Sequence, residues 1–166
     1  MLRPVACIFV GFVATGNAAS DCAWIDAAQK LIAAQSAVAI RDSEGGLNRR
    51  FSLQDLDRDG TFEVLETVSH YEDGLEFMNV ELAPAFEWTS VYRLDAGAYR
   101  ESTSDFKSFL LDRRSSYVLW LALLHEPSTL SDDSRQLIGH NRDEFVAVVR
   151  GYIARVDEAL RHVRSN

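Results

Sequence analysis

The chain has little cysteine and a shortage of positive charge, and each shortage excludes a class of protein. Two cysteines among 166 residues cannot make a disulfide-rich scaffold. Seventeen Lys and Arg against 25 Asp and Glu give a formal net charge of −8, which argues against a nucleic-acid partner. No apolar run approaches the roughly 20 residues that a membrane-spanning helix needs. The length and the 47% of hydrophobic residues fit one globular domain.

Recognisable catalytic motifs are also missing from the sequence. It contains no G-x-S-x-G nucleophile elbow, no G-x-x-x-x-G-K-[ST] phosphate loop and no H-E-x-x-H zinc motif. The four histidines are widely spaced, and none has a partner at zinc-ligand spacing. No residue is therefore assigned a catalytic role, and a non-enzymatic protein is expected. The alternative is a secreted hydrolase whose site assembles from residues scattered along the chain.

The first 19 residues have the order of a secretory signal peptide. Arg3 supplies a basic start, residues 5–13 are apolar, and Ala18 and Ala19 offer a cleavage site. We therefore expect a secreted or periplasmic protein with no transmembrane span after cleavage of residues 1–19.

Cleavage would leave a single cysteine in the mature chain, because Cys7 is removed and Cys22 stays. No internal disulfide can then form, and an unpaired thiol near the terminus is expected in preference to a bridge to another chain. The residues Ala19-Ser20-Asp21 do not match a lipoprotein cleavage site, so no lipid anchor is expected.

The mature chain is expected to form one α+β domain over residues 20–166. Within it, residues 20–103 should carry a helix and a β-meander, and residues 104–166 should be helical. The first helix is predicted over residues 23–39, where apolar side chains recur at helical spacing, with Asp21 as its N-cap.

Residues 51–102 have the alternating pattern of an antiparallel meander of three to five strands. Hairpin turns are predicted at Glu72-Asp73-Gly74 and at Asp95-Ala96-Gly97. Two strands are predicted from alternating apolar residues, the first from Met78, Val80 and Leu82, and the second from Phe86, Trp88, Tyr92 and Leu94.

The hydrophobic period becomes helical from Ser104, which is the expected N-cap of a helix that Pro127 closes. Residues 117–124 are apolar all round, which predicts a helix buried on every side. The residues expected to face the core are Phe106, Phe109, Leu110, Tyr117, Trp120, Leu121 and Leu124.

A second helix is expected to start at Ser131-Asp132-Asp133 and to be interrupted at Gly139, because Asn141 and Glu144 have the spacing of a capping box. It carries an apolar stripe from Phe145 to Val163. Both helices are expected to pack on the open apolar face of the meander. The Phe145–Val163 stripe could also serve a homodimer.

One motif carries specific chemistry, and it lies in the acidic half of the chain. Residues 20–100 hold 15 acidic and seven basic residues. Within them, Asp55, Asp57 and Asp59 stand at alternate positions before Gly60, which permits a sharp turn that presents the Thr61 carbonyl. Such a loop suits calcium, which takes six to eight oxygen ligands at about 2.3–2.6 Å. The alternative is a solvated acidic turn. It is disfavoured because residues 55–66 hold five carboxylates at the spacing of metal ligands.

The motif resembles the FG-GAP or VCBS-type calcium loop, in which D-x-D-x-D-G-x-x-D/E joins two strands. The resemblance covers about residues 51–100, including Val91–Arg100, which is similar to a hairpin that often follows such a loop in small secreted bacterial proteins. It implies side-chain ligands at Asp55, Asp57, Asp59 and Glu63 and a backbone ligand at Thr61. A single loop excludes a multi-bladed propeller.

The same residues also resemble an EF-hand loop. In that alternative Phe62 takes the apolar position and Glu66, twelfth in the loop, supplies the bidentate ligand in place of Glu63. A helix–loop–helix contour over residues 47–71 would support it.

The expected function is that of an exported calcium-binding protein. The ion is expected to be structural, and the protein to act as a non-enzymatic module that binds an unidentified protein or envelope partner. The alternative is an EF-hand-like protein in which calcium exposes a helical face to a partner.

Overall fold

The computed structural model describes residues 23–41, 45–72, 74, 75, 77 and 79–163. Their elements confirm the predicted α+β class, with one helix, a four-stranded antiparallel sheet and then two further helices. These elements are α1 (Ala23–Val38), β1 (Arg49–Gln54), β2 (Glu63–Val68), β3 (Trp88–Asp95), β4 (Ala98–Glu101), α2 (Lys107–His125) and α3 (Asp132–Val163). Short 3-10 turns lie at Ala83–Phe86, Thr103–Asp105 and Pro127–Thr129.

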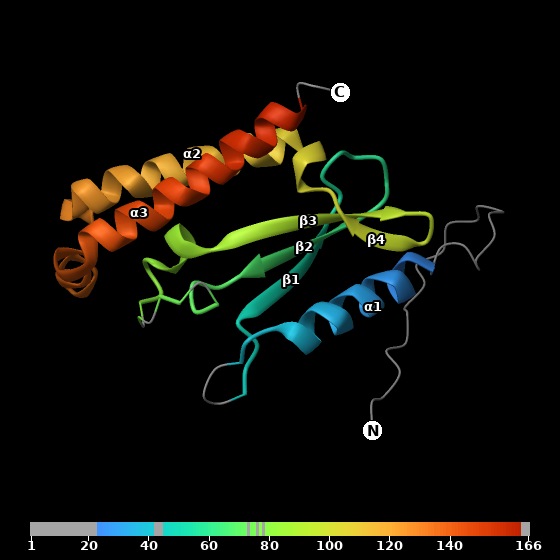
Figure 1. Cartoon of the computed structure of the whole chain (residues 1–166), viewed down its shortest axis with the longest axis horizontal. Coiled ribbons are helices and arrows are strands. Elements are labelled where there is room, and N and C mark those ends of the chain that lie inside the picture. The colour runs from blue at the N-terminus through green and yellow to red at the C-terminus, as the bar shows by residue number, and fades with distance from the viewer. Residues whose placement is uncertain (1–22, 42–44, 73, 76, 78, 164–166) are drawn as a thin grey trace, which may run out of the picture.

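The elements form three layers, with α1 on one side of the sheet and the α2–α3 hairpin on the other (Figure 1). The strands lie in chain order, β1-β2-β3-β4, and each pairs with the next. The β3–β4 turn falls at Ala96 and Gly97, both at positive φ, as a tight hairpin requires. The predicted turn at Asp95-Ala96-Gly97 is therefore confirmed.

The first helix also follows its prediction, and it covers one face of the sheet. Its side chains Ala27 and Ala28 are buried with Val64 of β2 and Tyr99 of β4. Small residues on the helix allow it to lie close to the strands. One face of the sheet is thus covered by α1.

The α2–α3 hairpin packs on the other face of the sheet, as predicted, and Trp88 of β3 belongs to its core. The long connection between β2 and β3 also contributes to this core, through Leu75, Phe77, Leu82 and Phe86. Leu65 and Val91, on the second face of the sheet, are covered by Phe106 at the start of α2. The apolar residues of this connection are buried against α2 and α3.

The strand predicted over residues 78–82 is not formed by its described residues, and Met78 and Asp73 lie outside them. Val80 is 92% exposed and Leu82 fully buried, so the two do not share a face. The side chain of Asn79 accepts a hydrogen bond from the Leu82 N–H at 2.9 Å, which favours a turn over a strand. Glu72 and Gly74 lie in a turn that is not followed directly by a strand, since β3 begins at Trp88 and leaves Phe86 in a 3-10 turn.

The first long helix begins later than predicted. A 3-10 turn includes Ser104, and α2 starts at Lys107 with Phe106 in the N-cap position. Its core face is formed by Leu110, Tyr117 and Leu124, as predicted. The expectation of burial all round is wrong, because other residues of α2 are exposed.

The second long helix begins after Ser131, whose hydroxyl accepts the Ser134 N–H as an N-cap does. Its break lies at Asn141 (φ −123°) and not at Gly139, which stays helical. The Asn141 side-chain amide donates to the Leu137 carbonyl at 3.0 Å, which explains the position of the kink. The predicted core stripe is confirmed by four buried residues, Phe145, Val149, Tyr152 and Val156.

Within the described part of the chain, no helix has both the length and the apolarity needed to cross a membrane. The predicted signal peptide, the N-cap Asp21 and Cys22 lie outside that part.

Candidate metal centre

The acidic motif forms the loop between β1 and β2. These strands pair in antiparallel register, with Gln54 opposite Glu63, so residues 55–62 form the hairpin loop that joins them. Arg58 and Gly60, at φ +62° and +87°, reverse the chain. The contour is strand–loop–strand, and the helix–loop–helix contour of the EF-hand alternative is not formed by the described residues of this segment.

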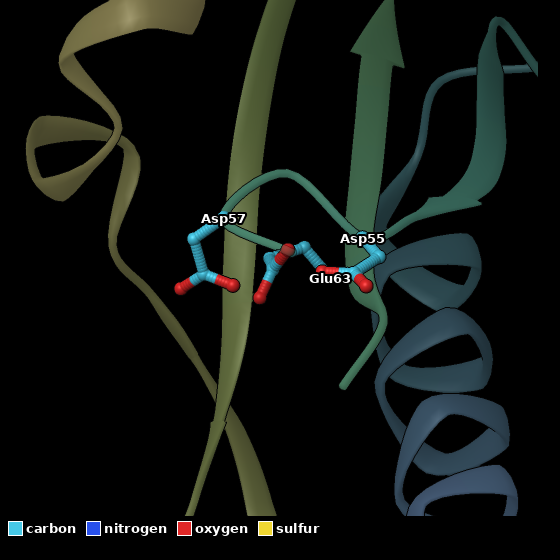
Figure 2. Close-up of side chains that lie close together, drawn as sticks. All are labelled: Asp55, Asp57 and Glu63. Carbon is cyan, nitrogen blue, oxygen red and sulfur yellow. The ribbon is translucent and has the colours of Figure 1, made fainter. Parts of the chain in front are cut away.

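Three carboxylates converge on one point of this loop. Asp55, Asp57 and Glu63 each place an oxygen within 4.8 Å of those of the other two (Figure 2). Oxygens bound to one calcium ion at about 2.3–2.6 Å are at most about 5 Å apart. The spacing of the three side chains therefore fits a single ion between them.

Glu63 is the member of the cluster whose surroundings most favour a bound cation. Its side chain is fully buried, and its Oε1 has no hydrogen-bond partner among the described residues. The other oxygen, Oε2, accepts the Leu56 N–H at 2.8 Å, which fixes the orientation of the carboxylate. Burial raises the pKa of Glu63, and the charges of Asp57 and Asp59 add to this rise while the Leu56 N–H opposes it. A buried carboxylate oxygen with no donor is a position that a cation would satisfy.

The loop backbone holds the two aspartates of the cluster in place. Asp55 accepts the N–H groups of Asp59 (3.1 Å) and Gly60 (3.2 Å). The Asp57 Oδ1 accepts the same Asp59 N–H at 3.3 Å. These bonds explain the Asp-x-Asp-x-Asp-Gly spacing, because each short acidic side chain caps a backbone N–H in the turn.

Asp59 and Thr61 were also expected as ligands, and they lie differently from the three clustered residues. The Asp59 Oδ1 accepts the Thr61 N–H at 2.7 Å, and Asp59 is not among the carboxylates that lie within 4.8 Å of one another. Both are next to the cluster in sequence and stay predicted ligands, and the structure groups only Asp55, Asp57 and Glu63.

Glu66 does not lie in the cluster. It stands three positions after Glu63 in β2, and an odd offset in a strand places its side chain on the opposite face of the sheet. There its carboxylate accepts hydrogen bonds from Arg49 (2.8 Å) and from the Tyr92 hydroxyl (2.7 Å). Between the two alternative ligands, the geometry favours Glu63.

A basic residue borders the site. The Arg93 Nη2 lies 2.5 Å from the Asp57 Oδ2, and its guanidinium packs over the ring of Phe106 at 4.6 Å. Arg93 and Asp57 both line a cavity of about 620 Å³ at the start of α2, through which an ion could reach the loop. A cation bound at this point would compete with Arg93 for the Asp57 carboxylate.

Two further contacts hold the loop in place, one from α1 and one from β4. Phe62 stacks on Trp24 at 5.6 Å between ring centroids, and the Tyr99 hydroxyl donates to the Phe62 carbonyl at 2.7 Å. Neither Tyr99 nor Arg93 was predicted as part of the site. Both lie in the hairpin segment that accompanied the family resemblance, but their pairing depends on strand register, which the loop motif does not contain.

Comparisons of this chain with known protein families, with curated proteins and with solved structures find no match.

Proposed function

We propose that the chain binds one calcium ion in the β1–β2 loop, and that it acts as an exported, non-enzymatic module stabilised by this ion. The observation that supports the proposal is the buried Glu63 Oε1, which has no donor within the described part of the chain and lies beside the carboxylates of Asp55 and Asp57. An unpaired buried charge is unfavourable unless a partner neutralises it. A hard divalent cation is the partner that oxygen ligands prefer.

The proposed ligand set consists of Asp55, Asp57 and Glu63, with Asp59 and the Thr61 carbonyl completing it. Calcium is favoured over magnesium, because a loop of this kind offers several oxygens in a flexible arrangement and magnesium demands a stricter octahedron. A structural role is favoured over a switch, because the loop joins strands that already pair with each other. Export rests on the sequence of residues 1–19 alone.

Calorimetric titration tests the proposal. Calcium added to chelator-treated protein should bind at one ion per chain, and Glu63→Gln should weaken binding at least about tenfold. Gln is the matched change, because its side-chain oxygen can still accept the Leu56 N–H while the charge is lost. Glu66→Gln is the control from the same strand, and it should leave the affinity unchanged, with far-UV circular dichroism to confirm that each variant is folded.

Two outcomes would contradict the proposal. Absence of binding up to about 10⁻² M calcium, a decade above the weakest affinity usual for extracellular modules, would make the loop an acidic turn. Binding that is lost in Glu66→Gln and kept in Glu63→Gln would assign the ion to the other face of β2.

A further inference from the structure

Arg93 lies between two acidic side chains, and only one of them belongs to the acidic loop. Its Nη2 is 2.5 Å from the Asp57 Oδ2, and its Nη1 is 3.8 Å from the Asp105 Oδ2. Asp105 ends the 3-10 turn that precedes α2, so it lies far from the loop in sequence. Its side chain is 54% exposed, and within the described part of the chain its carboxylate makes no closer polar contact than this one. Arg93 therefore has a second acceptor within reach that it does not fully use.

The Arg93 guanidinium is held in a position from which it can reach either acceptor. Its Cζ lies 4.6 Å from the centroid of the Phe106 ring, which is buried with Leu65 and Val91. The Arg93 Nε is buried and has no hydrogen-bond partner among the described residues, so the two terminal nitrogens carry the ion pairs of this side chain. A charged N–H···O hydrogen bond is about 2.7–2.9 Å long. A movement of about 1 Å at Nη1 would therefore complete a hydrogen bond to Asp105.

We propose that calcium binding in the β1–β2 loop transfers the Arg93 guanidinium from Asp57 to Asp105, and that Asp105 thereby raises the calcium affinity of the loop. This proposal rests on the proposed function, because it requires an ion at the three clustered carboxylates. An ion that takes the Asp57 carboxylate neutralises the charge that holds Arg93 and repels its guanidinium. Asp105 keeps the displaced guanidinium paired beside Phe106, which makes its displacement less unfavourable. Asp105 is thus a positioning residue for Arg93 and does not contact the ion.

The alternative arrangement has Asp57 shared between the ion and Arg93. The second oxygen of Asp57, Oδ1, accepts the Asp59 N–H at 3.3 Å. An ion bound through Oδ1 alone would leave Arg93 on Oδ2, and Asp105 would then have no part in calcium binding. Repulsion between two cations on one carboxylate disfavours this arrangement. The two arrangements differ in whether the effect of Asp105 depends on Arg93, which a double-mutant cycle measures.

Calorimetric calcium titration of a set of variants tests the proposal. Asp105→Asn removes the second acceptor with little change of shape, and it should lower the calcium affinity about threefold, the scale of a partly exposed ion pair. Asp105→Glu keeps an acceptor at this position and should retain most of the affinity. In the Arg93→Gln background, Asp105→Asn should have no such effect, because no guanidinium remains to be transferred. Far-UV circular dichroism confirms that each variant is folded.

Asp112→Asn is the matched control for the loss of one negative charge near the loop. Asp112 is exposed and lines the same cavity of about 620 Å³ as Arg93 and Asp105. No ion pair between Asp112 and Arg93 is found in the part of the chain that the structure describes. Its substitution should therefore leave the affinity close to that of the unchanged protein, with Arg93 and without it.

The outcomes separate this proposal from the proposed function. Calcium binding that is unaffected by Asp105→Asn would support the proposed function and overturn the transfer of Arg93. An effect of Asp105→Asn that is equal with Arg93 and with Arg93→Gln would do the same, because it would be an effect of charge alone. If the unchanged protein binds no calcium, both proposals fail together.

Discussion

The guanidinium of Arg93 lies against Asp57, which is also a proposed calcium ligand. Both side chains are about one-third exposed, so solvent weakens their attraction. An entering ion must still displace this charge from the carboxylate. We therefore expect Arg93→Gln to raise calcium affinity about threefold, which is the scale of a partly exposed ion pair. Calorimetric titration of the variant and the unchanged protein measures the difference.

The control for Arg93 is another exposed arginine of the same hairpin. Arg100 pairs with Asp95 at 3.2 Å, and neither residue belongs to the carboxylate cluster. Arg100→Gln should leave the affinity unchanged. A lower affinity in Arg93→Gln would show that Arg93 positions Asp57 for the ion and does not compete with it.

At this scale the sequence identifies the acidic side chains of the site but not their basic neighbour. Asp55, Asp57 and Glu63 are recognisable because their spacing is local, set by one tight turn. Arg93 is 36 residues from Asp57 in the chain and reaches it through the pairing of β2 with β3. The distinction between Glu63 and Glu66 likewise requires the strand assignment, which places them on opposite faces.

Among the elements, α1 and β1 are joined by a charged network around Arg49. Its guanidinium donates to Glu66 and Glu72, which are 3% and 8% exposed, and to the Gln35 side chain on α1. Removing one partner of a buried ion pair leaves the other charge uncompensated. Arg49→Met should therefore lower the free energy of unfolding by about 3 kcal/mol, as measured by urea denaturation.

The neighbouring residue of the same strand is a matched control. Arg50 is 72% exposed and pairs with Glu87 at 2.6 Å. Arg50→Met should change the free energy of unfolding by less than about 1 kcal/mol. Equal effects of the two substitutions would argue that the Arg49 network contributes no more than a surface pair.

The start of α3 is tied to the β2–β3 connection by Glu81. Its Oε2 accepts hydrogen bonds from the Ser134 and Ser131 hydroxyls and from the Ser131 N–H, which lower the pKa of Glu81 below its ordinary value of 4.5. A depressed carboxyl pKa stabilises the folded state above the ordinary value. This stabilisation is lost as pH falls from the ordinary value through the lowered one. Thermal melts of the protein and of Glu81→Gln should therefore differ near neutral pH and converge in acid.

A carboxylate elsewhere on the surface serves as the comparison for Glu81. Glu101→Gln, on β4, should not reproduce this loss of acid sensitivity. If Glu81→Gln melts like the unchanged protein near neutral pH, the hydrogen bonds at the start of α3 make no net contribution to stability.

The elements that could be predicted are those with strong local signals. The helix over residues 23–38, the Ala96-Gly97 turn and the Ser131 cap depend on periodicity or on turn and capping residues next to them. The β2–β3 connection could not be predicted, because its alternating apolar residues have the pattern of a strand and are buried by helices distant in the sequence. The exposure of Val118 and Leu119 was missed for the same reason, since an apolar helix face does not show which side the core occupies.

At the scale of the whole molecule, the sheet separates two apolar regions. The α1 region includes Val64 and Tyr99, and the hairpin region includes Tyr117 and Phe145. The proposed calcium loop contacts both sides of the sheet. Phe62 stacks on Trp24 of α1, and on the other side Arg93 lies over Phe106, which is buried with Leu65 and Val91. An ion at this loop would stabilise the contacts on both sides of the sheet.

Calcium is therefore expected to raise the melting temperature and to leave the far-UV circular dichroism unchanged. At about 1 mM ion and a dissociation constant of about 10⁻⁴ M, binding adds roughly 1.4 kcal/mol to the free energy of unfolding. For a domain of this size that corresponds to a rise of about 3 to 6 °C, measured by melting curves with calcium and with chelator. Glu63→Gln should melt at the same temperature in both. A large change in circular dichroism on adding calcium would instead favour the calcium-responsive alternative, because an ion that only stabilises paired strands cannot alter the helix content.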